Sequence, residues 1–156
     1  MSTNKIQQNQ AILLVEDNPD DVLITRRALL KGKISNALYV VNDGEEAVKF
    51  LRKENSYRGV CTPALVLLDL NMPKMDGFQV LREIKSDETL KSIPIIVLTT
   101  SDRDSDIDDA YRYGCNSYIV KPVSFEKFIK TVTDIKDYWL CLSRVPVDLG
   151  ATEVEK

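Results

Sequence analysis

Residues 65–77 decide how this chain is expected to fold, and they read LVLLDLNMPKMDG. The first four residues form a continuous apolar run, too short for a long helix and without the alternation of a strand that has one exposed face. Asp69 follows this run directly, and Asp76-Gly77 then gives a turn and helix-start signal. The segment therefore predicts a strand that is buried on both faces, ends at an acid and is followed by a helix.

Four further apolar runs of this kind are separated by segments long enough for a crossover helix. The five expected strands are residues 12–15, 38–41, 65–68, 95–98 and 118–120. The expected helix starts are Asp20 or Asp21, Asp43, Asp76, Asp102 and Ser124, and the expected stops of the first and fourth helices are Gly32 and Gly114. Strand and helix alternate five times, which predicts an α/β fold with a parallel sheet and helices on both faces.

The composition limits both the domain organisation and the chemistry. A chain of 156 residues with 44% apolar residues can form one core, and we expect one domain at residues 11–143 with polar tails at residues 1–10 and 144–156. Its three cysteines are far apart and odd in number, which argues against a disulfide framework or a thiolate zinc site. The absence of histidine excludes a Ser-His-Asp triad, an HExxH zinc site and a phosphohistidine carried by this chain.

The charge and the apolar runs limit the partners. A net charge of -3 gives no broad electropositive field, so nucleic acid is not an expected partner. Residues 1–10 lack the apolar region of a signal peptide, and no apolar run approaches the length of a membrane span. We therefore expect a cytoplasmic protein with no membrane partner.

The residues that follow the apolar runs carry the chemistry, because the carboxyl ends of parallel strands meet at one edge of the sheet. The polar residues at these ends are Glu16-Asp17 after the first run, Asp69 after the third, Thr99-Thr100 after the fourth and Lys121-Pro122 after the fifth. Three carboxylates, a hydroxyl and an ammonium group are thus expected to converge.

Three carboxylates at one place repel one another unless a cation neutralises them, and their oxygen ligands best match Mg2+. Asp69 lies between the other groups and is the candidate nucleophile, since a carboxylate can attack phosphorus and form an acyl phosphate. Thr99 and Lys121 would then bind the phosphoryl oxygens. Thr100 and Ser101 lie beside Thr99, so the sequence predicts a hydroxyl at this place more firmly than it predicts which residue supplies it.

Other acids have a plainer interpretation. Asp20 and Asp21 are assigned to the first turn of a helix, where negative charge is favourable. The same interpretation is the alternative for Glu16 and Asp17. The acidic run at residues 102–109 is expected to be a solvated helix face, with a buried stripe formed by Ile107, Ala110 and Tyr111.

Four segments resemble, in this order, the receiver domain of two-component response regulators. They are ILLVEDNPDD (12–21), LVLLDLNMPKMDG (65–77), PIIVLTTS (94–101) and YIVKP (118–122). This resemblance covers about residues 11–142 and implies a doubly wound, flavodoxin-like sheet of strand order 2-1-3-4-5. It also implies a phosphoacceptor switch, which receives its phosphoryl group on Asp69 from a histidine kinase in the presence of Mg2+ and acts through an unknown downstream protein.

The resemblance implies a role for each site residue. Asp17, Asp69 and the backbone carbonyl of Asn71 resemble the direct Mg2+ ligands, and Glu16 the acid that reaches the metal through water. The switch residues are implied to be Thr99, which supplies the hydroxyl, Tyr118, whose rotamer reports the switch, and Lys121, which pairs with the phosphoacceptor carboxylate and then with the phosphate. The Lys121–Pro122 bond is implied to be cis, which is plausible because X-Pro is the one peptide that adopts cis at low cost.

Two further segments are similar to a narrower group. The insert at residues 54–63 and the ending DYWLCLSRVP (137–146) resemble single-domain regulators that partner cyanobacterial phytochrome kinases. The partner kinase is therefore expected to be phytochrome-like.

The last helix predicts self-association. Its apolar residues recur at spacings of three and four, and a helix over residues 125–142 would span on the order of 28 Å, beyond the edge of the sheet. Trp139, Leu140 and Leu142 would then form an exposed apolar patch. We expect a homodimer through this end and the adjacent sheet edge, with Phe125, Tyr138, Trp139 and Leu142 at the interface.

Three other functions are weighed against the phosphoacceptor switch. A Mg2+-dependent phosphatase of the haloacid dehalogenase type also uses an aspartate after an apolar strand, but it needs a second acid two residues later, where this chain has Asn71. A nucleotide or flavin binder is disfavoured because none of the six glycines forms a GxGxxG or GxxxxGK pattern. A purely structural interaction module would not be phosphorylated.

Overall fold

The structure is a computed structural model that describes residues 10–72 and 74–142, with the backbone alone for Leu142. It is a five-stranded parallel sheet in the order β2-β1-β3-β4-β5, which confirms the expected fold and strand order. The strands are β1 (Ile12–Val15), β2 (Leu38–Val41), β3 (Leu65–Leu68), β4 (Ile95–Thr99) and β5 (Ser117–Val120). The helices are α2 (Pro19–Lys31), α3 (Gly44–Leu51), α4 (Gly77–Lys85), α5 (Asp104–Arg112) and α6 (Phe125–Lys136), with short helical segments η1 (Asn55–Tyr57) and η2 (Asp137–Leu142).

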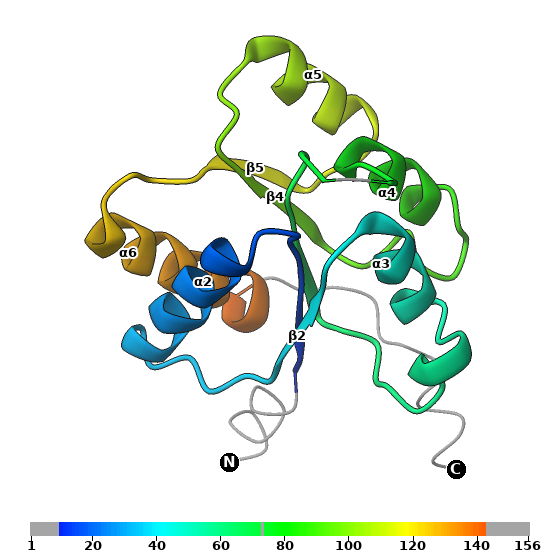
Figure 1. Ribbon diagram of the computed structural model, residues 1–156, viewed down its shortest axis with the longest axis horizontal. Coiled ribbons are helices and arrows are strands. Elements are labelled where there is room, and N and C mark those ends of the chain that lie inside the picture. Colours follow the sequence, from blue (N-terminus) through cyan, green and yellow to red (C-terminus); the bar gives the residue numbers. More distant parts are fainter. Residues whose placement is uncertain (1–9, 73, 143–156) are drawn as a thin grey trace.

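Two helical layers cover the sheet (Figure 1). Helices α2 and α6 lie on one face, and α3, α4 and α5 lie on the other. Leu13 and Val15 of β1 point into the core beneath α3 and α4, whereas Ile12 and Leu14 point into the core beneath α2 and α6. Because alternate residues of a strand face opposite sides, a strand between two helical layers must be apolar throughout.

The two edge strands depart from that expectation. Strand β2 contains exposed Tyr39, and β5 ends at Val120, which is 40% exposed. An edge strand has a neighbour on one side and is only partly covered by the helical layers. The prediction of full burial is therefore confirmed for β1, β3 and β4 and wrong for β2 and β5.

Two helix starts also differ from expectation. Helix α2 begins at Pro19, and the side chain of Asn18 caps it by accepting hydrogen bonds from the backbone N–H groups of Asp20 and Asp21. Proline suits the first helical position because its missing N–H would have no partner there. Helix α5 begins at Asp104 after Arg103. The expected caps of the other three helices, Asp43, Asp76 and Ser124, are confirmed.

The end of α6 corrects the expected apolar patch. The chain continues as the π-helical segment η2, and Leu140 is buried against the core beneath α2 and α6. A π-helical turn brings residues five apart to one face, so Leu140 follows Ile135 inward. Tyr138 is 54% exposed and Trp139 is half-buried, whereas the side chain of Leu142 lies outside the described residues. No helix in the described ranges combines the length and apolarity needed to cross a membrane.

Candidate functional site

Three acids meet at the carboxyl edge of the sheet. Strands β1 and β3 are paired with Val15 opposite Leu68, so Glu16 and Asp69 leave adjacent strands at the same level. One carboxylate oxygen each from Glu16, Asp17 and Asp69 lies within 4.8 Å of the other two. Glu16 is buried, Asp69 is nearly so and Asp17 is exposed. The expected convergence of the three carboxylates is confirmed.

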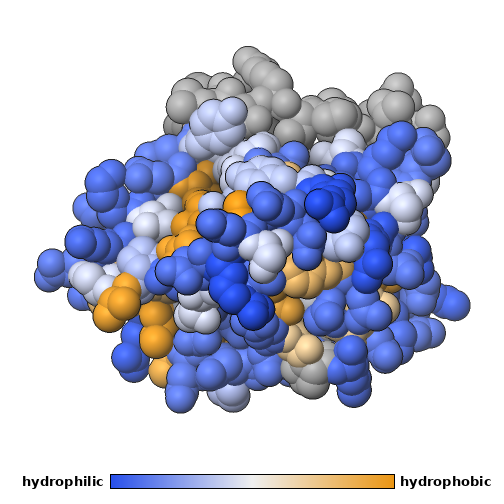
Figure 2. Space-filling view, turned by 90° about the horizontal axis from the view of Figure 1, so that it is seen from above, coloured by the Kyte–Doolittle hydropathy of each residue, from blue (hydrophilic) through white to orange (hydrophobic). Residues whose placement is uncertain are grey.

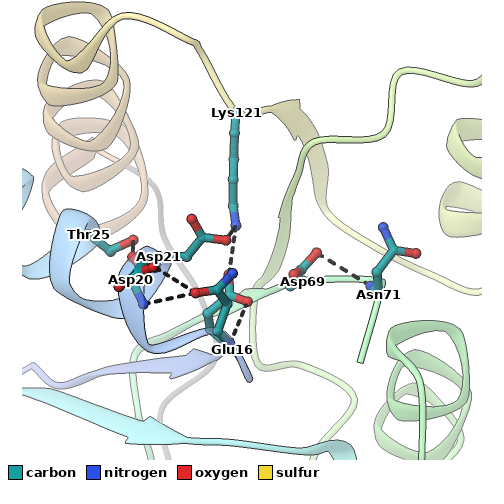
Figure 3. A network of polar contacts seen from close by, with 8 residues as sticks. Glu16, Asp20, Asp21, Thr25, Asp69, Asn71 and Lys121 are labelled. Atoms are coloured by element: carbon teal, nitrogen blue, oxygen red, sulfur yellow. Dashed lines mark hydrogen bonds and ion pairs between the residues drawn. The ribbon is translucent and has the colours of Figure 1, made fainter. Parts of the chain in front are cut away.

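Glu16 is the most unusual of these acids because its side chain is only 2% exposed. Burial raises the pKa of Glu16 to about 7, against the opposing effect of Lys121, and the nearby charge of Asp69 raises it further. Lys121 Nζ donates a hydrogen bond to Glu16 Oε1 at 2.6 Å, as Figure 3 shows. One lysine cannot neutralise three acids, so this edge of the sheet favours a further cation.

The donors at this edge fit a hard divalent cation. All three are carboxylates, and Asn71 and Asp17 line one open cavity of about 420 Å³. The Asn71 backbone N–H donates to Asp69 Oδ1 at 3.4 Å, which holds the start of the following loop beside Asp69. Oxygen ligands with space for water are what Mg2+ prefers. The acidic cluster therefore fits a metal site of this kind.

Lys121 is brought to the site, but its partners differ from those expected. Nζ pairs with Glu16 and lies 3.5 Å from Asp21 Oδ2, whereas no hydrogen bond or ion pair with Asp69 occurs in the part of the chain that the structure describes. The buried Glu16 carboxylate has the greatest need of a counterion, because little water reaches it. Asp21, to which the sequence assigns only a helix-start role, thus also contacts this lysine.

The bond between Lys121 and Pro122 is trans, so the expected cis bond is wrong for this structure. The trans form is intrinsically favoured by about 0.5–1 kcal/mol even before proline. With the trans bond, the Lys121 side chain still reaches Glu16, so this contact does not need the cis form.

Thr99 ends β4 with its side chain fully buried. Its Oγ1 has no hydrogen-bond partner among residues 10–72 and 74–142, whereas the neighbouring Thr100 is exposed. A buried hydroxyl without a partner costs about 1–3 kcal/mol. Of the two adjacent threonines, Thr99 is therefore the one whose buried hydroxyl would gain most from a new hydrogen bond.

Ser101, two residues after Thr99, contacts Tyr118 and Asp106, an acid to which the sequence analysis gave no such role. Tyr118 Oη donates to the backbone carbonyl of Ser101 at 2.9 Å, and Ser101 Oγ donates to Asp106 at 2.6 Å. Asp106 is buried, although its acidic run was expected to be solvated, and Tyr111 of the expected buried stripe is 51% exposed. The sequence signal for Asp106 is its position three residues after Arg103, which pairs with it, but the same spacing is common on exposed helices.

An apolar groove of about 430 Å³ lies beside Lys121, between α2 and the start of α6. Ile24, Val123 and Phe125 line it with exposed apolar surface, and Val123 is fully exposed. In Figure 2, hydrophobic residues gather toward the left of the view. Figure 1 places α2 and α6 on this side of the molecule.

Comparison with known proteins places this geometry in a family. The model of the response regulator receiver domain matches residues 12–133. The protein named "Probable methanogenesis regulatory protein FilR2" of Methanothrix harundinacea is 44% identical over 135 residues, which cover 86% of each chain. The response regulator Rcp1 of Synechocystis sp. is 39% identical over 131 residues, 84% of this chain and 89% of Rcp1.

Solved structures agree with the sequence relatives. The Mn2+-bound form of Rcp1 matches with a TM-score of 0.80 and 38% identity, over 88% of this chain and 99% of that structure. The phosphorylated cyanobacterial phytochrome response regulator RcpA matches with a TM-score of 0.83 and 41% identity, over 89% and 99%. The chain therefore belongs to the response regulator receiver family, related to phytochrome response regulators, and is a phosphoacceptor rather than an enzyme.

Proposed function

We propose that Asp69 accepts a phosphoryl group from the phosphohistidine of a partner kinase, with Mg2+ held by Asp17, Asp69 and the backbone carbonyl of Asn71 and, through water, by Glu16. The observation that carries this proposal is the convergence of three carboxylates on one sheet edge, where Lys121 pairs with Glu16. Asp69 alone of the three follows the central strand β3, between the other acids and Thr99.

The transfer is a displacement at phosphorus. An Asp69 carboxylate oxygen forms the new bond to phosphorus as the bond between phosphorus and the kinase imidazole breaks, and the imidazole leaves with the electron pair. The bound cation supplies positive charge that offsets the negative charge on the phosphoryl oxygens. Lys121 then exchanges its bond with Glu16 for one with the phosphoryl group, and Thr99 donates to the same group.

The apolar groove next to Lys121 favours an approach from the side of α2. Ile24, Val123 and Phe125 offer exposed apolar surface beside the acids, which suits an amphipathic helix that carries the phosphohistidine. The similarity to RcpA, a cyanobacterial phytochrome response regulator, supports a phytochrome-like kinase as this partner. We place the switch in the cytoplasm, where such a kinase domain would meet it.

The phosphoryl step can be tested without the kinase. We expect the intact mass of the protein to increase by one alkali-labile phosphoryl group after incubation with acetyl phosphate and Mg2+. EDTA should prevent the gain, and Mn2+ should restore it, because the donors are carboxylate oxygens that accept either ion. A wild-type protein that stays unmodified at saturating Mg2+ would rule out the phosphoacceptor role.

Output is proposed to occur by contact with an unknown downstream protein, and self-association is part of that proposal. Phe125 and Tyr138 are 38% and 54% exposed, and Trp139 is half-buried. Strand β5 is an edge strand, and one row of its backbone groups has no neighbouring strand among residues 10–72 and 74–142. A second copy that packs on this edge would bury these groups together. Leu142, the fourth residue expected at the interface, lies outside the described side chains.

We expect sedimentation to show a dimer at micromolar concentration and Tyr138→Glu to shift it to the monomer, because a buried carboxylate at the interface lacks a partner. Tyr111→Glu, on the exposed side of α5, is the matched control and should sediment like wild type. A monomeric wild type, with and without phosphorylation, would contradict the dimer.

A further inference from the structure

Among the residues that the structure describes, Asp106 is the most buried acid outside the cluster of Glu16, Asp17 and Asp69. It lies in the first turn of α5, in a helix with three other aspartates, and is 8% exposed. Its Oδ2 accepts hydrogen bonds from Ser101 Oγ at 2.6 Å and from Arg103 Nε and a terminal Arg103 nitrogen at 3.1 and 3.0 Å. The Ser101 hydrogen bond, supported by Arg103, holds the pKa of Asp106 below its usual range, so the acid is ionised.

These contacts anchor the loop that follows Thr99. Residues 100–103 connect β4 to α5, and Ser101 is held at two points: Oγ on Asp106 and the backbone carbonyl on Tyr118 Oη. Arg103 N–H also donates to Ser101 Oγ, at 3.4 Å. The loop is thus fixed to α5 on one side and to β5 on the other.

These contacts oppose a movement of Thr99, the last residue of β4, toward Asp69. Thr99 Oγ1 is buried without a hydrogen-bond partner in the described part of the chain, and a phosphoryl oxygen on Asp69 would provide one. If Thr99 moves toward Asp69, the residues directly after it must move as well, and the bond from Ser101 to Asp106 is stretched or broken. The loop as it lies in this structure is therefore stabilised by the Ser101–Asp106 bond, which a loop that moved with Thr99 would give up.

We propose that Asp106 is a positioning residue that holds the loop at residues 100–103 in its resting place and so sets how readily phosphorylation moves Thr99 and Tyr118. The proposal rests on Asp69 being the phosphoacceptor. Removal of the carboxylate should favour the active arrangement, because a population shift depends on contacts that differ between the two states.

A simple helix-start role is the competing explanation, since an acid in the first turn of a helix is favourable in itself. The hydrogen bonds that Asp106 accepts come from side chains of the preceding loop, Ser101 and Arg103, rather than from the backbone N–H groups of α5. A residue that serves only the helix would change stability and leave the balance between the two loop positions unaltered. The two explanations therefore predict different effects on the binding of a phosphoryl mimic.

The test is the affinity of the Mg2+-loaded protein for beryllofluoride, measured by NMR titration of the backbone amides. We expect Asp106→Ala to raise this affinity about tenfold, which corresponds to the loss of one hydrogen bond to a charged group from the resting state alone. Ser101→Ala should act in the same direction, and the double variant should add little to either, because both changes remove the same bond. Asp106→Asn keeps an acceptor oxygen and should lie between wild type and Asp106→Ala.

Asp108→Ala is the matched control, since Asp108 is an exposed acid of the same helix with no hydrogen bond or ion pair to the described residues, and its affinity should equal that of wild type. An unchanged or lowered affinity in folded Asp106→Ala and Asp106→Asn would overturn the inference. If wild type fails to bind beryllofluoride, the proposed phosphoacceptor role fails instead. The side-chain resonance of Tyr118 without any ligand then tests the anchoring separately: it should shift in Asp106→Ala, and an unshifted resonance would overturn the inference.

Discussion

Asp69→Asn is expected to gain no phosphoryl group from acetyl phosphate and Mg2+. The amide carries no negative charge, and its oxygen is a far weaker nucleophile than a carboxylate oxygen, so the bond to phosphorus does not form. The change also removes one of the three carboxylates that fit the cation. Intact mass spectrometry over a time course that fully modifies wild type is the measurement, and no modified species should be detected.

The matched control is Asp20→Asn, which removes an exposed acid at the start of α2 and leaves the three clustered carboxylates in place. This variant should be modified at nearly the wild-type rate. A phosphoryl group on Asp69→Asn would mean that another acid is the acceptor, and peptide mapping of the modified protein would identify it. Asp17 would be the first residue to inspect, because its carboxylate shares the cluster.

Gly77→Ala is expected to lower the free energy of unfolding by about 1–3 kcal/mol, a common cost of overpacking a core. Gly77 is the first residue of α4, and a Cβ there would lie 2.6 Å from the backbone carbonyl oxygen of Asp69 and 2.6 Å from the Cα of Leu70. Both neighbours are backbone atoms, which cannot rotate away. Relief requires the segment after β3 to move, and this segment carries Asp69, so cation affinity should fall in the same variant.

Gly59→Ala is the matched control for this substitution, because a Cβ at Gly59 meets no described atom within 4 Å. Its stability in urea denaturation should stay within about 0.5 kcal/mol of wild type. Helix propensity alone favours alanine over glycine by up to about 1 kcal/mol and would give Gly77→Ala a stabilising sign. A variant as stable as wild type, with unchanged cation binding, would show that the Asp69 segment tolerates displacement.

Much of the fold could be predicted from the sequence because its signals are local or repeat along the chain. A strand covered by helices on both faces must be apolar at every position, and β1, β3 and β4 carry this pattern unmistakably. The two edge strands have the same apolar pattern but are less buried. Four residues are too few for the sequence to show that the helices cover a strand only partly. Helix starts were predicted only to within two residues: Asn18 rather than an aspartate caps α2, and α5 begins after Arg103, whose side chain does not cap it.

The members of the site were predictable for a related reason. In a parallel sheet, the residue after each strand arrives at one edge whatever the details of packing, so Glu16, Asp69 and Lys121 had to lie near one another. Their pairing was not predictable. Lys121 contacts Glu16 and Asp21 rather than Asp69, and the choice depends on how deeply each carboxylate is buried.

By itself, therefore, the sequence determined the order of strands and helices, the set of polar residues at the sheet edge and, through the absence of histidine, that any phosphohistidine must come from a partner. Only the tertiary structure decided which acid holds Lys121, that Thr99 Oγ1 lacks a partner in the described chain, and that Asp106 is buried against Ser101. The physical reason is that backbone pattern is local, whereas burial and hydrogen-bond partners depend on which side chains from distant segments exclude water from one another.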